Sequence, residues 1–219
     1  LLYARRICTN VTKVPMKELV GNTPAIKQAI SEEKGKIFIK EFPPATITPN
    51  QLKGFIKKFQ EQGIELDAII LDYLNLMHST MGNNSYERIK HVTEQVRAMS
   101  YLFNCPIISA TQLNRAGFDT DNPDLATISE SIGLASTADV ICSIFQNEED
   151  RELGIIRLGM MKNRYGPRGA TQAMRIDYST LSIEEADDIE FEDDSMETLS
   201  TLAGLASCLL YTSDAADEE

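Results

Sequence analysis

The stretch DAIILD, residues 67–72, is a short and nearly continuous apolar run between two aspartates. Runs of this kind are typical of a strand that is buried on both faces of a parallel sheet. CPIISA at 105–110 and DVICSIF at 139–145 have the same character, and a long helical pattern at 86–103 separates the first two runs. Strands that alternate with crossover helices indicate an α/β fold with a mostly parallel sheet.

The surrounding residues predict further helices. Thr23 and Pro24 supply an N-cap and a proline at the first helical position of one helix. Residues 48–51 (TPNQ) have the spacing of a capping box and begin a second helix. The apolar stripe of this second helix is Leu52, Phe55, Ile56 and Phe59. The helix at 86–103 has its apolar positions at Ile89, Val92, Val96, Met99 and Leu102.

Three more segments predict strands. KIFIKEF at 36–42 alternates apolar and polar residues, as a strand with one buried face does. Residues 154–161 and 170–178 are predicted as two strands on either side of a turn at 165–167.

The composition excludes several classes of protein. A chain of 219 residues with 42% hydrophobic residues is long and apolar enough for one globular domain. No window approaches about eighteen apolar residues in a row, no secretory signal begins the chain, and the four cysteines contain no C-x-x-C pair. We therefore expect no membrane span, no structural zinc site and no disulfide framework, and a reducing cytoplasm as the location.

The net charge of −12 comes from one end of the chain. Thirteen of the 33 acidic residues lie in 184–219, which contains no Lys or Arg, so the preceding residues are close to neutral. Neutrality does not exclude nucleic acid, because phosphate binding needs a local basic or amide-lined surface and not a basic total.

Both ends of the sequence differ from its middle. The chain begins with LLYARRICTNVT, which has no initiator Met and is typical of the middle of an amphipathic helix. We expect one domain at 1–185, followed at 186–207 by an acidic tail without stable structure. Residues 208–219 resemble the translation of a sequencing adapter, the alternative being a natural acidic tail.

Open parallel sheets bind ligands beyond the carboxyl ends of their strands. Asp72 stands at such an end, where a carboxylate either holds Mg²⁺ against nucleotide phosphates or only caps a helix or is solvated in a loop. Gln112 follows the next strand, and its amide either contacts a γ-phosphate or is an ordinary loop residue. Lys162 and Arg164 lie two residues apart after a later strand, where they either bind phosphate or are simply solvated.

Four segments occur in a fixed order: IILDYLNLM at 69–77, IISATQLNR at 107–115, ISESIGLASTADVI at 128–141 and MMKNRYGPRG at 160–169. Together they resemble the ATPase domain of DnaB-type replicative helicases, especially the branch found in tailed bacteriophages. The resemblance covers residues 1–185 and implies a RecA-like P-loop NTPase core. It also implies an ATP-dependent enzyme that moves along single-stranded DNA and unwinds the duplex at the replication fork, with ATP and Mg²⁺ as cofactors.

The resemblance assigns a role to each candidate side chain. Asp72 matches the Walker B aspartate that supports Mg²⁺, and Gln112 matches the glutamine that senses the γ-phosphate. Arg164 matches the arginine finger, which reaches the ATP of the neighbouring subunit, and Lys162 lies beside it. The resemblance therefore implies a homo-hexamer, with a primase and a helicase loader as further partners.

A second set of residues is implied in binding single-stranded DNA. Glu130 and Ser131 fall in the loop that contacts the DNA backbone in this family, and the loop at Asn83 and Asn84 is expected to join it. Ser129 stands where many cellular relatives carry an Arg, which puts one phosphate contact in doubt.

The chain also departs from the family pattern. It contains no G-x-x-x-x-G-K-[ST] loop, whose amides and Lys cradle phosphates. The glutamate that polarises the attacking water is missing as well. In this fold the P-loop strand lies between the strands at 105–110 and 139–145, so we expect a core with unpaired strand edges. We interpret the chain as an N-terminally truncated fragment that does not hydrolyse ATP by itself.

Two alternatives stay open. Another RecA-like ATPase of recombination or repair shares much of the pattern, although KNRYGP at 162–167 favours the helicase. A non-catalytic binding or assembly subunit without a P-loop is the other.

Overall fold

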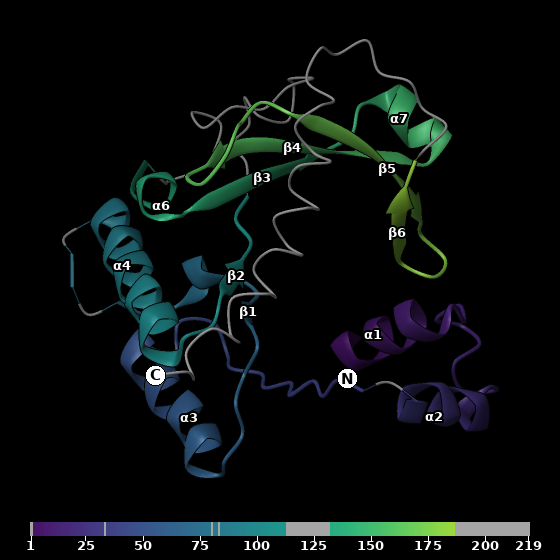
Figure 1. The fold of residues 1–219 in the computed structure, drawn as a ribbon, viewed down its shortest axis with the longest axis horizontal. Coiled ribbons are helices and arrows are strands. Elements are labelled where there is room, and N and C mark those ends of the chain that lie inside the picture. The colour runs from purple at the N-terminus through teal and green to yellow at the C-terminus, as the bar shows by residue number, and fades with distance from the viewer. Residues whose placement is uncertain (1, 33, 80, 83, 113–131, 187–219) are drawn as a thin grey trace, which may run out of the picture. The chain divides into compact units, whose positions relative to one another are not determined.

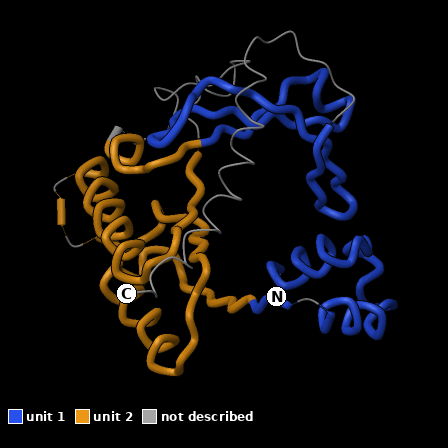
Figure 2. The backbone as a smooth tube through the Cα atoms, in the orientation of Figure 1, with its two compact units in different colours: residues 1–36, 142–219 blue, residues 37–141 orange. Residues whose placement is uncertain are grey.

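The computed structural model describes residues 2–32, 34–79, 81–82, 84–112 and 132–186. Within the described residues between Pro49 and Asn163, helices and strands alternate (Figure 1), as the sequence predicts. No helix among them is long and apolar enough to cross a membrane. The chain forms two compact units (Figure 2): unit 1 comprises Leu1–Lys36 and Cys142–Glu219, and unit 2 comprises Ile37–Ile141.

Unit 2 contains a parallel pair of strands with helices. Its elements are α3 (Pro49–Glu61), β1 (Ile69–Leu71), the 3₁₀ helix η1 (Leu74–Leu76), α4 (Ser85–Phe103), β2 (Ile107–Ser109), α6 (Ile132–Thr137) and the first residues of β3. β1 and β2 run parallel, with Ile69 opposite Ile107 and Leu71 opposite Ser109. Both predicted strands are therefore confirmed, and so is their parallel pairing, although each ladder is three residues long. The prediction that they are buried on both faces was wrong, because Ile70 is 75% exposed and Ile108 is 55% exposed on the face opposite the core.

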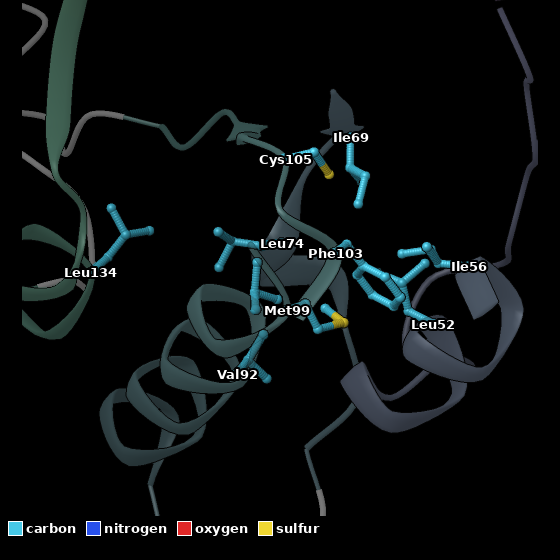
Figure 3. Packing of buried hydrophobic residues seen from close by; sticks show 10 residues of the cluster. Leu52, Ile56, Ile69, Leu74, Val92, Met99, Phe103, Cys105 and Leu134 are labelled. Carbon is cyan, nitrogen blue, oxygen red and sulfur yellow. The ribbon is translucent and has the colours of Figure 1, made fainter. Parts of the chain in front are cut away.

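One face of α4 builds the core of unit 2 (Figure 3). The buried cluster draws side chains from α3, α4, α6, β1, η1 and the approach to β2: Leu52, Ile56, Ile69, Leu74, Val92, Val96, Met99, Phe103, Cys105 and Leu134. The predicted apolar positions of α4 are buried, with one exception. Leu102 is 47% exposed, whereas the next residue, Phe103, is 9% exposed. The prediction for Leu102 was wrong because a helix of 3.6 residues per turn carries position 103, not 102, back to the face of Met99.

Side chains fix where the helices of unit 2 begin. The capping box of α3 is confirmed, because Gln51 N donates to Thr48 Oγ1 at 3.3 Å and Thr48 N donates to Gln51 Oε1 at 2.8 Å. α4 begins at Ser85, and Glu87 N donates to the side chain of Asn84 at 2.8 Å. Each cap satisfies an amide that has no partner within its own helix.

The strand predicted at 36–42 does not form. The described structure assigns no ladder to these residues, and Ile37, Phe38 and Ile39 are exposed. The segment is held instead by ring contacts to α3, with centroid distances of 5.0 Å for Phe38–Phe59 and 5.6 Å for Phe42–Phe55. An alternating pattern forms a strand only where a neighbouring strand pairs with its backbone hydrogen-bonding groups. This prediction was wrong because no described strand pairs with residues 36–42.

Unit 1 contains a four-stranded sheet and a pair of helices. Its elements are α1 (Leu2–Thr12), α2 (Thr23–Glu32), most of β3 (Val140–Phe145), α7 (Glu148–Leu153), β4 (Ile155–Asn163), β5 (Thr171–Asp177) and β6 (Ser182–Glu185). The strand order is β3-β4-β5-β6, and the pairs β4–β5 and β5–β6 are antiparallel. The connections between consecutive strands of this sheet are too short for the crossover that a parallel pair needs. In the described residues, the parallel pairing that the sequence predicts is therefore found in the β1–β2 pair.

β2 and β3 belong to separate sheets in the described part of the chain. β2 is hydrogen-bonded to β1, and β3 is hydrogen-bonded to β4.

Candidate functional site

The turn after β1 presents Asp72 at the surface. Asp72 follows Leu71, the last residue of β1, and its side chain is exposed. The peptide bond from Asp72 to Tyr73 is cis. Leu74 then begins η1 and is buried in the core, so the turn is anchored directly beside the exposed carboxylate.

A hydroxyl of the neighbouring strand holds this turn. Ser109 Oγ donates to Leu71 O at 2.9 Å and accepts from Leu74 N at 3.1 Å. One side chain of β2 therefore bridges the two residues that enclose Asp72 and Tyr73. Asn75 Nδ2 also donates to Thr111 Oγ1, at 3.4 Å.

Gln112 lies beyond the same ends of the two strands. It is exposed and follows the last residue of β2, Ser109, by three positions. Because Leu71 is opposite Ser109 in the parallel register, Asp72 and Gln112 both leave the sheet at its carboxyl edge. This is the arrangement that the sequence predicts for these two residues.

The donor set at this edge suits a cation that is shared with another ligand. Asp72 is a single carboxylate, and the described residues contain no group of three or more His, Cys, Asp or Glu that could hold a metal ion. Asn75 Oδ1 is buried and has no hydrogen-bond partner in the described structure. Mg²⁺ is usually held by one or two carboxylates, water and substrate phosphates, so the residues fit Mg²⁺ together with a phosphate ligand.

Lys162 and Arg164 form a separate group in unit 1. Lys162 lies near the end of β4 and is half-buried, whereas Arg164 follows the strand and is exposed. The turn between β4 and β5 is shaped by Asn163 Oδ1, which accepts from Tyr165 N at 3.1 Å. The predicted turn at 165–167 is confirmed, and it places a guanidinium on an exposed connection.

Only part of the predicted DNA-contacting set can be placed. Asn83, Glu130 and Ser131 lie outside the described residues, as does Ser129. Asn84 is described, and its Oδ1 caps α4, a role that we did not predict.

The sequence reasoning also missed Ser109 and Thr111. The signal was present, because both are hydroxyl residues in the otherwise apolar run IISAT. Their contacts depend on the register with β1, however, and the sequence alone does not give that register.

Comparison with known proteins identifies a matching family. Residues 2–181 match the family model described as the DnaB-like helicase C-terminal domain. The chain is 24% identical to the DnaB-like replicative helicase of Enterobacteria phage T4 over 139 residues, which are 61% of this chain and 29% of that protein. It is 29% identical to the replicative DNA helicase DnaB of Mycoplasma genitalium over 144 residues, 60% of this chain and 31% of that protein. The chain thus spans less than a third of the length of these curated relatives.

Two solved structures share the fold. One is an ATPase domain, which superposes with a TM-score of 0.70 at 18% identity and covers 83% of this chain and 69% of that one. The other is a DnaB-like replicative helicase, whose structure was determined with its interactions with primase. It gives a TM-score of 0.68 at 18% identity and covers 82% of this chain and 47% of that one. The fold is therefore that of RecA-like helicase ATPase domains.

Proposed function

The chain belongs to the DnaB-like helicase C-terminal domain family, and on this basis we propose that it is part of an ATP-dependent replicative DNA helicase. Such a motor moves along single-stranded DNA and unwinds the duplex. The observation that carries the proposal is the shared carboxyl edge of β1 and β2, from which Asp72 and Gln112 both leave the sheet.

We assign the nucleotide contacts of unit 2 to these two residues. Asp72 would support Mg²⁺, which neutralises phosphate charge when it is bound, and the Gln112 amide would contact the γ-phosphate. The 219 residues contain no G-x-x-x-x-G-K-[ST] loop. The parent protein would therefore supply that loop from another part of its sequence, and the isolated chain is not expected to hydrolyse ATP.

Arg164 supports a site that two subunits share. It is exposed on a connection of unit 1, with Lys162 two residues before it. We propose that Arg164 reaches the nucleotide of a neighbouring copy in a homo-hexamer, where a finger supplied in trans contributes about 10³ to 10⁵ in rate. Single-stranded DNA would contact the loops that carry Asn83, Asn84, Glu130 and Ser131. A primase and a loader would bind the assembled ring in the cytoplasm, which is that of the host cell if the protein is phage-encoded.

Mixing two inactive variants of the parent protein tests this proposal. Asp72→Asn removes the metal-supporting carboxylate, and Arg164→Ala removes the finger, so each variant alone is expected to lose DNA-stimulated ATP hydrolysis. In a mixed ring, an Arg164→Ala subunit still offers Asp72 to the intact Arg164 of an Asp72→Asn neighbour. Random mixing in equal amounts restores about a quarter of the interfaces of a closed ring, and ATPase activity should return to that extent.

A double variant provides the matched control. Mixing Arg164→Ala with Asp72→Asn/Arg164→Ala creates no complete interface, so no activity should return. Recovery in this control would contradict the trans assignment. ATP turnover by the purified 219-residue chain that Arg164→Ala abolishes would contradict the expectation that the isolated chain does not hydrolyse ATP. A parent protein without any ATPase activity would favour a non-catalytic binding subunit.

A further inference from the structure

A shallow apolar hollow, open to the surface, lies at the helix pair α1 and α2 of unit 1. Its volume is about 200 Å³, and it is lined mainly by Ala4, Arg5, Cys8, Leu19, Ile26 and Lys27. Leu19 and Ile26 are buried, whereas Arg5 and Lys27 are exposed. The hollow is therefore apolar inside and bounded by two cations.

Arg5 on α1 and Lys27 on α2 are the cations that line the hollow. α1 contains Arg5 and Arg6 and no acidic residue. Within the described ranges, neither Arg5 nor Lys27 forms an ion pair with a carboxylate. An apolar hollow between cations is complementary to a segment that combines acidic and apolar side chains.

Such a segment lies in the same chain. Residues 187–194 read DDIEFEDD, with six carboxylates and two apolar residues, Ile189 and Phe191. A run of like charge does not fold by itself, but it can bind a surface of opposite charge.

The structure brings the chain to this surface just before that segment. Lys13, directly after α1, donates from Nζ to Ser182 Oγ at 2.6 Å and pairs with Glu184 Oε1 at 3.3 Å. Asn10 of α1 donates from Nδ2 to Leu181 O at 2.6 Å. β6 is thereby held at the C-terminal end of α1.

The length of the segment is comparable to the distance along α1 that separates Lys13 from the hollow. Cys8 precedes Lys13 by five residues and Ala4 by nine, which is about 8–14 Å at the rise of a helix. The chain at β6 runs from Leu181 beside Asn10 to Glu184 beside Lys13, so it has to turn back after Glu185 to meet the hollow. An extended chain spans about 13 Å from Glu185 to Ile189 and about 20 Å from Glu185 to Phe191, which matches this distance.

We propose that residues 187–194 bind across α1 and α2, with Ile189 and Phe191 in the apolar hollow and the carboxylates beside Arg5 and Lys27. The segment thereby covers the apolar surface that the helix pair exposes. This inference does not depend on the proposed helicase activity, because every residue it uses lies outside the candidate nucleotide site.

Disulfide trapping on the full chain tests the contact. Cys8 lines the hollow and serves as the native probe. Glu192→Cys places a second thiol beside the two apolar residues and leaves both of them intact, in a background of Cys142→Ser and Cys208→Ser. Mild oxidation should join this thiol to Cys8. Trypsin cuts after Arg6, Lys13 and Arg175, so mass spectrometry should find Ile7–Lys13 linked to the C-terminal peptide that begins at Ile176.

Thr198→Cys in the same background is the matched control. The two thiols differ by only six residues in a loop of more than 180, so tethering alone gives them nearly equal rates. A bound segment raises the local concentration of the nearer thiol, and we expect cross-linking of the Glu192→Cys chain to be at least about tenfold faster. Equal rates would overturn the proposal, and so would cross-links between two chains in place of one, which would assign the hollow to the segment of a second copy.

Further variants test the contribution of the cations and that of the apolar side chains separately. Arg5→Glu/Lys27→Glu, and separately Ile189→Ser/Phe191→Ser, should each reduce the rate of the Glu192→Cys chain to that of the control. Arg6→Glu/Lys17→Glu makes the same change in net charge with residues that do not line the hollow, and it should leave most of the difference in place. Circular dichroism of each variant checks that α1 and α2 remain folded.

Discussion

Ser109 Oγ on β2 lies 2.9 Å from the carbonyl oxygen of Leu71 on β1 and donates a hydrogen bond to it. The same hydroxyl accepts from Leu74 N, so it joins the end of one parallel strand to both sides of the turn that carries Asp72. The orientation of the candidate metal-supporting carboxylate therefore depends on a side chain of the strand that leads to Gln112.

Ser109→Ala should destabilise unit 2 measurably. The substitution leaves the amide of Leu74 without its acceptor, and an unsatisfied amide of this kind costs about 1–3 kcal/mol. Urea unfolding followed by circular dichroism measures the change in free energy of unfolding. Ser109→Thr keeps the hydroxyl and should retain most of the stability. If both substitutions left stability unchanged, the bridge would have no energetic role.

Phe103 and Leu102 should respond very differently to truncation. Phe103→Ala removes a buried side chain from the cluster of unit 2 and is expected to cost about 3–5 kcal/mol. Leu102→Ala removes an exposed side chain and should change the free energy of unfolding by about 0.5 kcal/mol or less. The pair is compared in the same urea titration. A larger loss from Leu102→Ala would contradict the observed face of α4.

The pKa of Asp177 should depend on the hydrogen bonds that its carboxyl group accepts in the β5–β6 turn. Thr180 Oγ1 donates to Asp177 at 2.7 Å and Ser179 N donates to it at 2.8 Å. These bonds lower the pKa of Asp177 from 3.8 to about 2. Because the pKa is lower in the folded state, the stabilisation is complete above pH 3.8 and is lost as the pH falls through about 2.

Thr180→Ala should therefore raise the pKa of Asp177 from about 2 toward 3.8. An NMR titration of the Asp177 carboxyl carbon measures it directly. Thr180→Ser keeps the donor, and its pKa should remain close to that of the parent chain. A value that stays near 2 in Thr180→Ala would show that the threonine hydroxyl is not the main cause.

Arg157→Met should be most harmful at neutral pH. Asp150 is 2% exposed, and Arg157 binds both of its oxygens, at 2.7 and 2.9 Å. The guanidinium lowers the pKa of this carboxyl group, so the pair stabilises the fold above the ordinary pKa of 3.8 and loses this effect as the pH falls below it. Removing the arginine leaves a buried charge and should cost about 3 kcal/mol.

Urea unfolding of Arg157→Met at pH 7 and at pH 3 measures this dependence. The destabilisation relative to the parent chain should shrink at the lower pH, because the carboxyl group becomes protonated. Asp150→Asn/Arg157→Met carries no buried charge and should show little pH dependence of this kind. An equal loss at both pH values in the single variant would argue against an ionic role for the pair.

Most helices and the carboxyl ends of β1 and β2 follow from local sequence patterns. The apolar runs at 67–72 and 105–110 predict strands because short, nearly continuous apolar runs are typical of parallel sheets, although only one face of this pair is buried. Thr48 and Gln51 predict the start of α3 because a capping box needs only four consecutive residues. The parallel arrangement then places Asp72 and Gln112 at one edge without further information.

The tertiary structure alone decided what each segment pairs with. The alternating pattern at 36–42 is compatible with a strand. In the structure, ring contacts to α3 hold this segment, and it forms no hydrogen-bonded ladder with another described strand. The bridge from Ser109 to the Asp72 turn requires the observed register of β1 with β2, which joins residues 38 positions apart. Local patterns depend on a few neighbouring residues, whereas hydrogen-bonded partners depend on which distant segments are close enough to accept the bonds.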